Sequence, residues 1–129
     1  MSEPLNLLIV EDDASIVYII KIELSAYGFD VKETHVENAY QMKMALRKKK
    51  FDVIISDHHM PSFSSIDALF IRNEFCWETP FLIYTNCMPE KIRSMAIREG
   101  CNMVLEKEDV FQLPKVIEQL ICETKKIIE

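Results

Sequence analysis

Polar side chains that could do chemistry stand directly after short apolar runs at four places in the chain. Asp57 follows FDVIIS, three consecutive acidic residues at 11–13 follow LNLLIV, Thr85 ends PFLIYT, and Lys107 follows NMVLE. Carboxylate oxygens are hard ligands that suit Mg²⁺. A carboxylate grouped with a metal ion, a lysine and a hydroxyl can accept a phosphoryl group as an acyl phosphate. The residue types therefore indicate phosphoryl transfer to an aspartate, provided that the fold brings them together.

Each of these residues also has an ordinary structural explanation. Asp12 or Asp13 could cap the following helix, because aspartate is a favoured N-cap residue. Asp57 could belong to a turn, Thr85 is common in strands, and Lys107 could be a solvated charge. Each explanation is adequate for one residue alone. A site is favoured because every one of these strand ends carries a group of a suitable type.

The two histidines in FDVIISDHHMP suggest a different kind of site. His58 and His59 could bind Zn²⁺ or Ni²⁺, but adjacent loop residues rarely reach one ion, and His35 belongs to another strand end. The cysteines form no CxxC pair, which argues against a zinc site or a redox motif. We expect no physiological transition-metal site, and we expect free thiols in a reducing cytoplasm. The cysteines are Cys76, Cys87, Cys101 and Cys122.

The hydrophobic pattern alternates between short apolar runs and helical periods. It predicts strands at 5–10, 29–35, 51–56, 80–85 and 102–106, and helices at 14–28, 37–50, 66–75, 89–100 and about 113–128. Buried strands that alternate with helices predict a parallel sheet covered on both faces. We therefore expect one α/β domain over residues 1–129, a (βα)5 doubly wound fold in which the common flavodoxin-like strand order 2-1-3-4-5 is favoured. Ligands of such sheets bind beyond the carboxyl ends of the strands, where the polar residues fall.

Composition argues against several function classes. Lys and Arg total 15 against 21 Asp and Glu, a net charge of −6, which argues against direct binding of nucleic acid or an anionic membrane. Apolar runs of about six residues are too short to cross a bilayer, and MSEPLNLLIVEDD lacks the features of a signal peptide. The basic residues 47–50 are interpreted as favourable charge at a helix C-terminus. We expect a cytoplasmic location.

The segments LLIVEDD, VIISDHHMP, PFLIYT and GCNMVLEK together resemble the receiver domain of two-component response regulators, over essentially the whole chain. The resemblance implies that Asp57 is the phosphoacceptor. It also implies a Mg²⁺ ion held by Asp12 and Asp13, with Asp57 and the backbone carbonyl of His59 as the other protein ligands. Thr85 and Lys107 match the pair that senses the phosphoryl group.

The resemblance also implies partners. A phosphohistidine on a histidine kinase or phosphotransfer protein would be the donor, and a downstream effector or fused output domain would bind the face formed by the fourth helix, fifth strand and fifth helix. The ending LEKEDVFQLPKVIEQL resembles receivers joined to sensor or hybrid kinases. Ile127 and Ile128 continue the apolar spacing of the last helix. A frayed helix end and a continuation into a linker or homodimer contact both explain this.

Several positions depart from the receiver pattern. Asn86 stands where the family usually has Ala or Gly, and a larger side chain there narrows the approach to the phosphoryl group. Val104 replaces the usual switch aromatic, and Glu108 replaces the proline after the lysine. By their placement, His59 and Cys87 would flank the phosphoryl group and control the access of water.

Three functions from different classes follow from these observations. The first is a phosphorylation-dependent signalling switch, which is not an enzyme beyond its own phosphorylation and dephosphorylation. The second is a pseudo-receiver, a scaffold that takes no phosphate, which Asn86 and Val104 keep open. The third is a phosphatase of the haloacid dehalogenase type. That class needs Asp-x-Asp after the first strand, which VEDDAS does not supply, and the chain has no room for a cap domain. A flavin site is disfavoured by the acidic loop after the first strand.

Overall fold

The computed structural model describes the backbone of residues 3–128 and the side chains of residues 3–125. Five parallel strands form one sheet in the order β2-β1-β3-β4-β5, which confirms the predicted fold. The strands are β1 (Pro4–Val10), β2 (Asp30–Val36), β3 (Val53–Ser56), β4 (Phe81–Thr85) and β5 (Met103–Glu106). The helices are α1 (Ala14–Tyr27), α2 (Ala39–Lys48), α3 (Ser65–Phe75), α4 (Glu90–Arg98) and α5 (Leu113–Ile128). The side chains of Ile127 and Ile128 lie outside the described ones.

One element was not predicted from the sequence. A 3-10 helix, η1 (Lys107–Gln112), joins β5 directly to α5. The pattern KEDVFQ has no helical hydrophobic period of its own, so periodicity gives no signal for it. The consequence for the site is that Lys107 is the first residue of a turn rather than part of an open loop.

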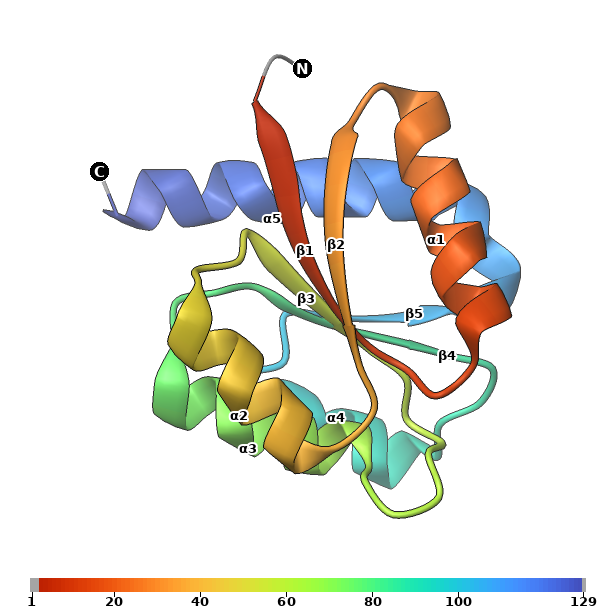
Figure 1. The fold of residues 1–129 in the computed structure, drawn as a ribbon. Coiled ribbons are helices and arrows are strands. Elements are labelled where there is room, and N and C mark those ends of the chain that lie inside the picture. Colours follow the sequence, from red (N-terminus) through yellow and green to blue (C-terminus); the bar gives the residue numbers. More distant parts are fainter. Residues whose placement is uncertain (1–2, 129) are drawn as a thin grey trace.

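Helices cover the sheet on both faces (Figure 1). One face is covered by α1 and α5, and the other by α2, α3 and α4. Successive strand residues point to opposite faces, so each strand contributes to two hydrophobic clusters. On β3, for example, Ile54 belongs to the cluster under α2 and α3, and Ile55 to the cluster under α1 and α5. Both side chains are almost fully buried, which holds the central strand rigidly in place.

The helix ends follow from local sequence. Gly28 closes α1 with φ of 119°, a left-handed conformation that favours glycine. Ser64 and Asp67 form a reciprocal capping box at the start of α3. Pro89 is the N-cap of α4, so the helix begins one residue later than the predicted range. These caps determine where the loops at each end of the sheet begin.

A buried arginine forms hydrogen bonds with several segments at the end of the sheet where the strands begin. Arg72 of α3 is only 3% exposed, and its guanidinium donates to the carbonyls of Trp77 (2.8 Å), Thr79 (2.9 Å) and Gly100. The guanidinium also lies 5.8 Å from the centre of the Phe81 ring. Burial lowers the pKa of Arg72 from its ordinary value. Arg72 therefore joins α3, the loop before β4 and the end of α4.

Within the described residues, no helix is both long and apolar enough to cross a membrane.

Candidate functional site

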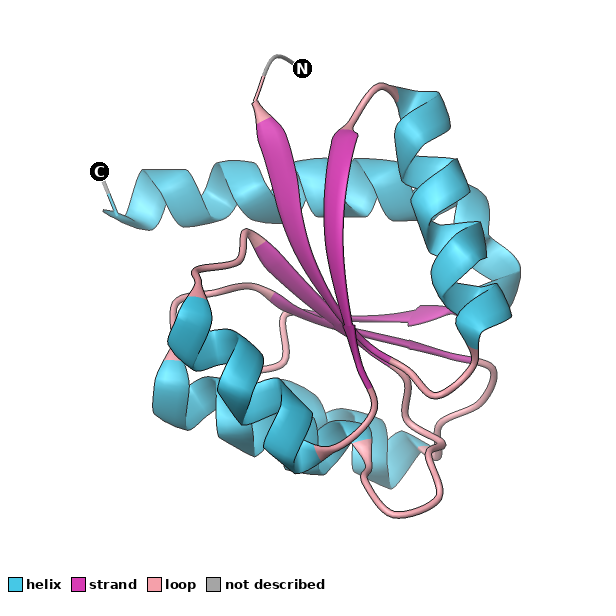
Figure 2. Ribbon diagram, viewed as in Figure 1, coloured by secondary structure: helices cyan, strands magenta, loops and turns pink. Residues whose placement is uncertain are grey.

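The loops that follow β1, β3 and β4 gather at one end of the sheet (Figure 2). Asp57 lies there immediately after β3 and is 5% exposed. Its backbone N–H donates to the carbonyl of Val10 on β1 at 2.9 Å, which extends the ladder between the two strands by one residue. The hydroxyl of Ser56 donates to the Asp57 carbonyl at 3.0 Å. The backbone of Asp57 is therefore fixed on both sides at the carboxyl ends of the central strands.

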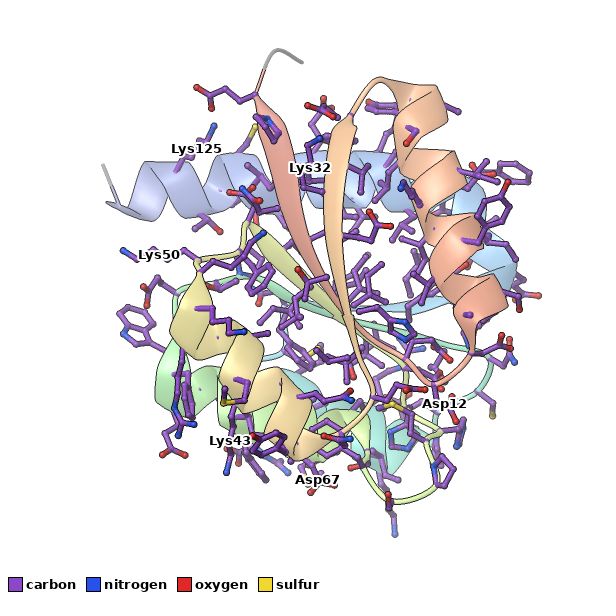
Figure 3. The ribbon with its side chains drawn as sticks, viewed as in Figure 1. Asp12, Lys32, Lys43, Lys50, Asp67 and Lys125 are labelled. Atoms are coloured by element: carbon purple, nitrogen blue, oxygen red, sulfur yellow. The ribbon has the colours of Figure 1, made fainter. Side chains whose placement is uncertain are left out.

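Two carboxylates after β1 converge on Asp57. One carboxylate oxygen from each of Glu11, Asp12 and Asp57 lies within 4.8 Å of the others. Glu11 and Asp57 are buried, and Asp12 is exposed at the mouth of the site, beside the loops (Figure 3). Burial, and then the nearby charge of Asp57, raise the pKa of Glu11 to about 7. Such a group of hard carboxylate oxygens is suited to a divalent cation.

Asp13 caps α1, which is one of the two explanations that the sequence left open for it. Its carboxylate accepts from the backbone N–H of Ser15 at 2.9 Å and from the Ser15 hydroxyl at 2.6 Å, and so caps α1. These hydrogen bonds lower the pKa of Asp13. Since α1 begins at Ala14, the N-cap position falls on Asp13. The capping alternative therefore applies to Asp13, and the structure groups Glu11 with Asp12 and Asp57 instead.

Lys107 supplies the positive charge of the site. Its Nζ lies 3.3 Å from Oδ1 of Asp57 and 3.8 Å from Oε2 of Glu11. The lysine side chain is 15% exposed, and the two carboxylate side chains are 6% and 4% exposed, so water screens these charges only weakly. The structure thus brings together the predicted Asp57 and Lys107, although they are 50 positions apart in the printed sequence.

The loops after β3 and β4 share one carbonyl as a hydrogen-bond acceptor. The ring Nε2 of His59 lies 2.8 Å from the carbonyl oxygen of Cys87, and the buried hydroxyl of Thr85 donates to the same oxygen at 3.4 Å. Asn86 and Cys87 are exposed beside it. These contacts join the two loops next to Asp57.

The neighbouring histidine points elsewhere. Nδ1 of His58 lies 2.8 Å from the hydroxyl of Ser65 at the start of α3, and its ring meets that of His59 edge to face with the centres 4.8 Å apart. Burial, and then the His59 ring, lower the pKa of His58. Among the described residues, neither histidine belongs to a group of three potential metal-ligating side chains.

The residue at the expected switch position is buried. Val104, at the expected switch position, is 7% exposed and lies in the hydrophobic cluster beneath α3 and α4.

A second acidic group, which the sequence analysis missed, consists of Glu106, Glu108 and Asp109 beside Lys107. The signal for it was the run EKED, where three acidic residues surround the lysine.

Comparison with known proteins places these features in context. A family model described as the response regulator receiver domain matches residues 7–118. A probable transcriptional regulator, ycf29, of Cyanophora paradoxa is 29% identical over 122 residues, which cover 91% of this chain and 56% of that protein. Probable histidine kinase 1 of Oryza sativa subsp. indica is 32% identical over 84 residues, which cover 60% of this chain and 8% of that protein. The chain therefore spans little more than half of the first relative and a small part of the second.

Solved receiver structures share the fold. The receiver domain of a sensor histidine kinase from Pseudomonas aeruginosa, described with a magnesium ion coordinated in its active-site cleft, has a TM-score of 0.77 and 20% identity, covering 92% of this chain and 98% of that one. A CheY-like receiver from Methanospirillum hungatei has a TM-score of 0.84 and 18% identity, covering 96% and 98%. At these identities the likeness shows the common fold.

Proposed function

Because this chain belongs to the response regulator receiver domain family, a family of signalling modules rather than enzymes, we propose that it is a phosphorylation-dependent switch with Asp57 as the phosphoacceptor. The observation that carries the proposal is the grouping at the carboxyl ends of the strands. Asp57 is held rigidly between two carboxylates after β1 and the ammonium group of Lys107, 3.3 Å away. A rigid nucleophile beside a preorganised positive charge is what transfer of a phosphoryl group requires.

The donor set fits Mg²⁺. We propose the carboxylates of Glu11, Asp12 and Asp57 and the backbone carbonyl of His59 as protein ligands, so that Glu11 takes the place first expected for Asp13. The fit rests on the chemistry of the group: all the donors are hard oxygens, and three carboxylates lie beside the single ammonium group of Lys107. When bound, the ion would neutralise charge on the phosphoryl oxygens.

The chain's own residues then have distinct parts in the transfer. An oxygen of Asp57 forms a bond to phosphorus while the P–N bond of a partner's phosphohistidine breaks. Lys107 neutralises the negative charge that arrives, and the hydroxyl of Thr85 turns from the Cys87 carbonyl to the phosphoryl group. The 3.4 Å distance of that hydrogen bond is long, so little free energy is lost when it breaks.

Water access would be set by the residues beside Asp57. The His59 ring, held to the Cys87 carbonyl, and the exposed Asn86 border the approach to the acceptor. With Val104 at the switch position, no aromatic ring can swing there in response to Thr85. We propose instead that the movement passes through the Cys87 carbonyl to the loop before α4, and from there to a partner on the face of α4, β5 and α5.

The binding partners and the cellular location of the chain are also proposals. Receiver domains generally act with histidine kinases, and we propose a histidine kinase or phosphotransfer protein as the donor and an effector or fused output domain as the recipient, in the cytoplasm. That residues 1–129 are one receiver domain, with the last helix at about 113–128 continuing into a linker or homodimer contact, stays a prediction.

Intact-mass measurement after incubation with acetyl phosphate tests the function. We expect the wild-type chain with Mg²⁺ to gain the mass of one phosphoryl group, and the matched Asp57→Asn variant to gain nothing. Wild type treated with EDTA is the second control. If wild type gains no mass with Mg²⁺ although it is folded and binds the ion, the scaffold function replaces the switch.

A further inference from the structure

Tyr84 is a buried residue of β4 on the sheet face opposite to Thr85. Every residue of β4 is buried, and alternate side chains point to opposite faces. Tyr84 is 3% exposed and belongs to the cluster under α1 and α5. The phosphoryl chemistry described above uses Thr85 and makes no use of its neighbour.

The Tyr84 side chain contacts Lys107 at both ends of the lysine. Its hydroxyl donates to the backbone carbonyl of Lys107 at 3.3 Å, and Nζ of Lys107 lies 6.0 Å from the centre of its ring. An ammonium group at this distance over an aromatic ring is weakly attracted to it. Burial raises the pKa of Tyr84 to about 12, so the hydroxyl keeps its proton and remains a donor.

Lys107 lies at the junction between β5, whose last residue Glu106 pairs with Thr85, and η1. The residue starts η1, which has no side-chain hydrogen bond at its N-cap among the described residues, and Asp109 within η1 has a non-helical backbone. Glu108 follows the lysine and does not restrict the backbone as a proline would. The tyrosine hydroxyl therefore supplies a side-chain hydrogen bond at the start of η1, where the N-cap residue supplies none.

We propose that Tyr84 is a positioning residue for Lys107: its hydroxyl fixes the backbone from which the lysine extends, and its ring supports the ammonium group beside Asp57. This inference rests on the proposed function, since it is the phosphoryl group that needs the lysine in place. A lysine side chain loses considerable conformational entropy when it is held in one position. If the Lys107 side chain is already restrained before phosphorylation, this entropy is not lost during phosphoryl transfer.

Tyr84→Phe tests the proposal because it removes the hydroxyl and keeps the ring. The matched control is Tyr27→Phe, which removes a hydroxyl that donates to Glu118 at 3.1 Å, between α1 and α5. Three properties are measured on wild type and both variants: the Mg²⁺ affinity, the affinity for beryllofluoride in saturating Mg²⁺, and the NMR signals of the Lys107 amide and ammonium groups without any ligand.

We expect Tyr84→Phe to weaken beryllofluoride binding by about three- to tenfold, the effect of one hydrogen bond. Mg²⁺ affinity should stay within about twofold, because the lysine is not a metal ligand. The Lys107 signals should shift or broaden in the unliganded variant, and Tyr27→Phe should match wild type throughout. A merely structural role would lower the Mg²⁺ and beryllofluoride affinities together, and that result would overturn the proposal.

The NMR signals separate this inference from the function on which it rests. If wild type binds no beryllofluoride and takes no phosphate, the proposed function fails. The positioning claim is then decided by the unliganded protein alone. Unchanged Lys107 signals in Tyr84→Phe would refute it, and changed signals with an unchanged Tyr27→Phe control would support it.

Discussion

Two cationic side chains, the half-buried Lys107 and the buried Arg72, lie at opposite ends of the same sheet, and their surroundings differ in kind. Lys107, where the strands end, has carboxylates at 3.3 and 3.8 Å. Arg72, where the strands begin, has no carboxylate within ion-pair distance among the described residues and donates to backbone carbonyls. Lys107 therefore lies beside carboxylates that a ligand can rearrange, whereas Nη1 and Nη2 of Arg72 donate to the main chain and its Nε has no hydrogen-bond partner among the described residues.

We infer from this difference that Lys107 serves the chemistry of the site and that Arg72 stabilises the fold. The carbonyls around Arg72 belong to the loop before β4 and to the end of α4, and would be left without a donor if the guanidinium were lost. Arg72 also fills the space beside Gly100, where an added Cβ would lie 3.2 Å from its Nη2. The ammonium of Lys107, by contrast, is partly open to solvent beside the acceptor. We therefore expect loss of Arg72 to affect stability and loss of Lys107 to affect phosphorylation.

The largest expected effect is on stability. Arg72→Met should lower the free energy of unfolding by about 3 kcal/mol, because it leaves three backbone carbonyls, one of them buried and two partly buried, without their donor. Chemical denaturation measures this. Arg47→Met is the matched control, since Arg47 also lies over an aromatic ring, 5.5 Å from the centre of Phe75, but is exposed. Equal losses for the two variants would show that the buried carbonyls do not matter.

The second prediction concerns the rate of phosphorylation. Lys107→Met should slow phosphorylation by acetyl phosphate about a hundredfold, the usual effect of losing a preorganised charge in an active site. The rate is followed by intact mass over time. Arg72→Met, measured at a temperature where it is folded, should keep a rate close to that of wild type. A similar fall in both variants would abolish the distinction between the two cations.

The third prediction is a dependence of stability on pH. The pKa of Glu11 is about 7 in the folded protein and 4.5 ordinarily, so the folded state holds the proton more tightly than the unfolded state. This contribution to stability is present below pH 4.5 and is lost as the pH rises through 7. In EDTA, Glu11→Gln should therefore be more stable than wild type at pH 8, by about 2 kcal/mol, and no more stable at pH 4.

Addition of Mg²⁺ provides the control for this measurement. Wild type should be stabilised at pH 8 and Glu11→Gln much less so, because the ion binds the folded state through that carboxylate. Denaturation curves at both pH values, with and without the ion, give the comparison. Asp13→Asn should respond to Mg²⁺ like wild type, and a lost response would restore Asp13 as a ligand.

The smallest expected effect concerns the lifetime of the phosphorylated state. His59→Ala removes the ring held to the Cys87 carbonyl at 2.8 Å, which opens the approach for water. Dephosphorylation should become about fivefold faster, which is a change of about 1 kcal/mol in the barrier, because water reaches the phosphoryl group more easily. His58→Ala, whose ring bonds Ser65 instead, is the matched control. An unchanged rate in His59→Ala would exclude the gating role.

Much of the fold could be predicted because buried parallel strands have a simple signature. Runs such as LNLLIV and FDVIIS are apolar on both faces, and helices with their own period lie between them, which leaves few topologies. The same reasoning predicted that Asp57 and Lys107 meet, since the carboxyl ends of parallel strands share one edge. The first turn after β5 could not be found in this way, because η1 has no hydrophobic period.

The amino-acid pattern alone is enough to predict the α/β class, the favoured strand order, and the chemical types of the residues at one end of the sheet. Tertiary structure alone decided which carboxylates after β1 face Asp57. Three acidic residues in a row are equivalent in composition, and the start of α1 at Ala14 makes Asp13 the cap and leaves Glu11 and Asp12 grouped with Asp57. It also decided that Tyr84 reaches Lys107 and that Arg72 meets three carbonyls. Such contacts join residues distant in sequence, and they exist only when the packed layers fix where each side chain ends.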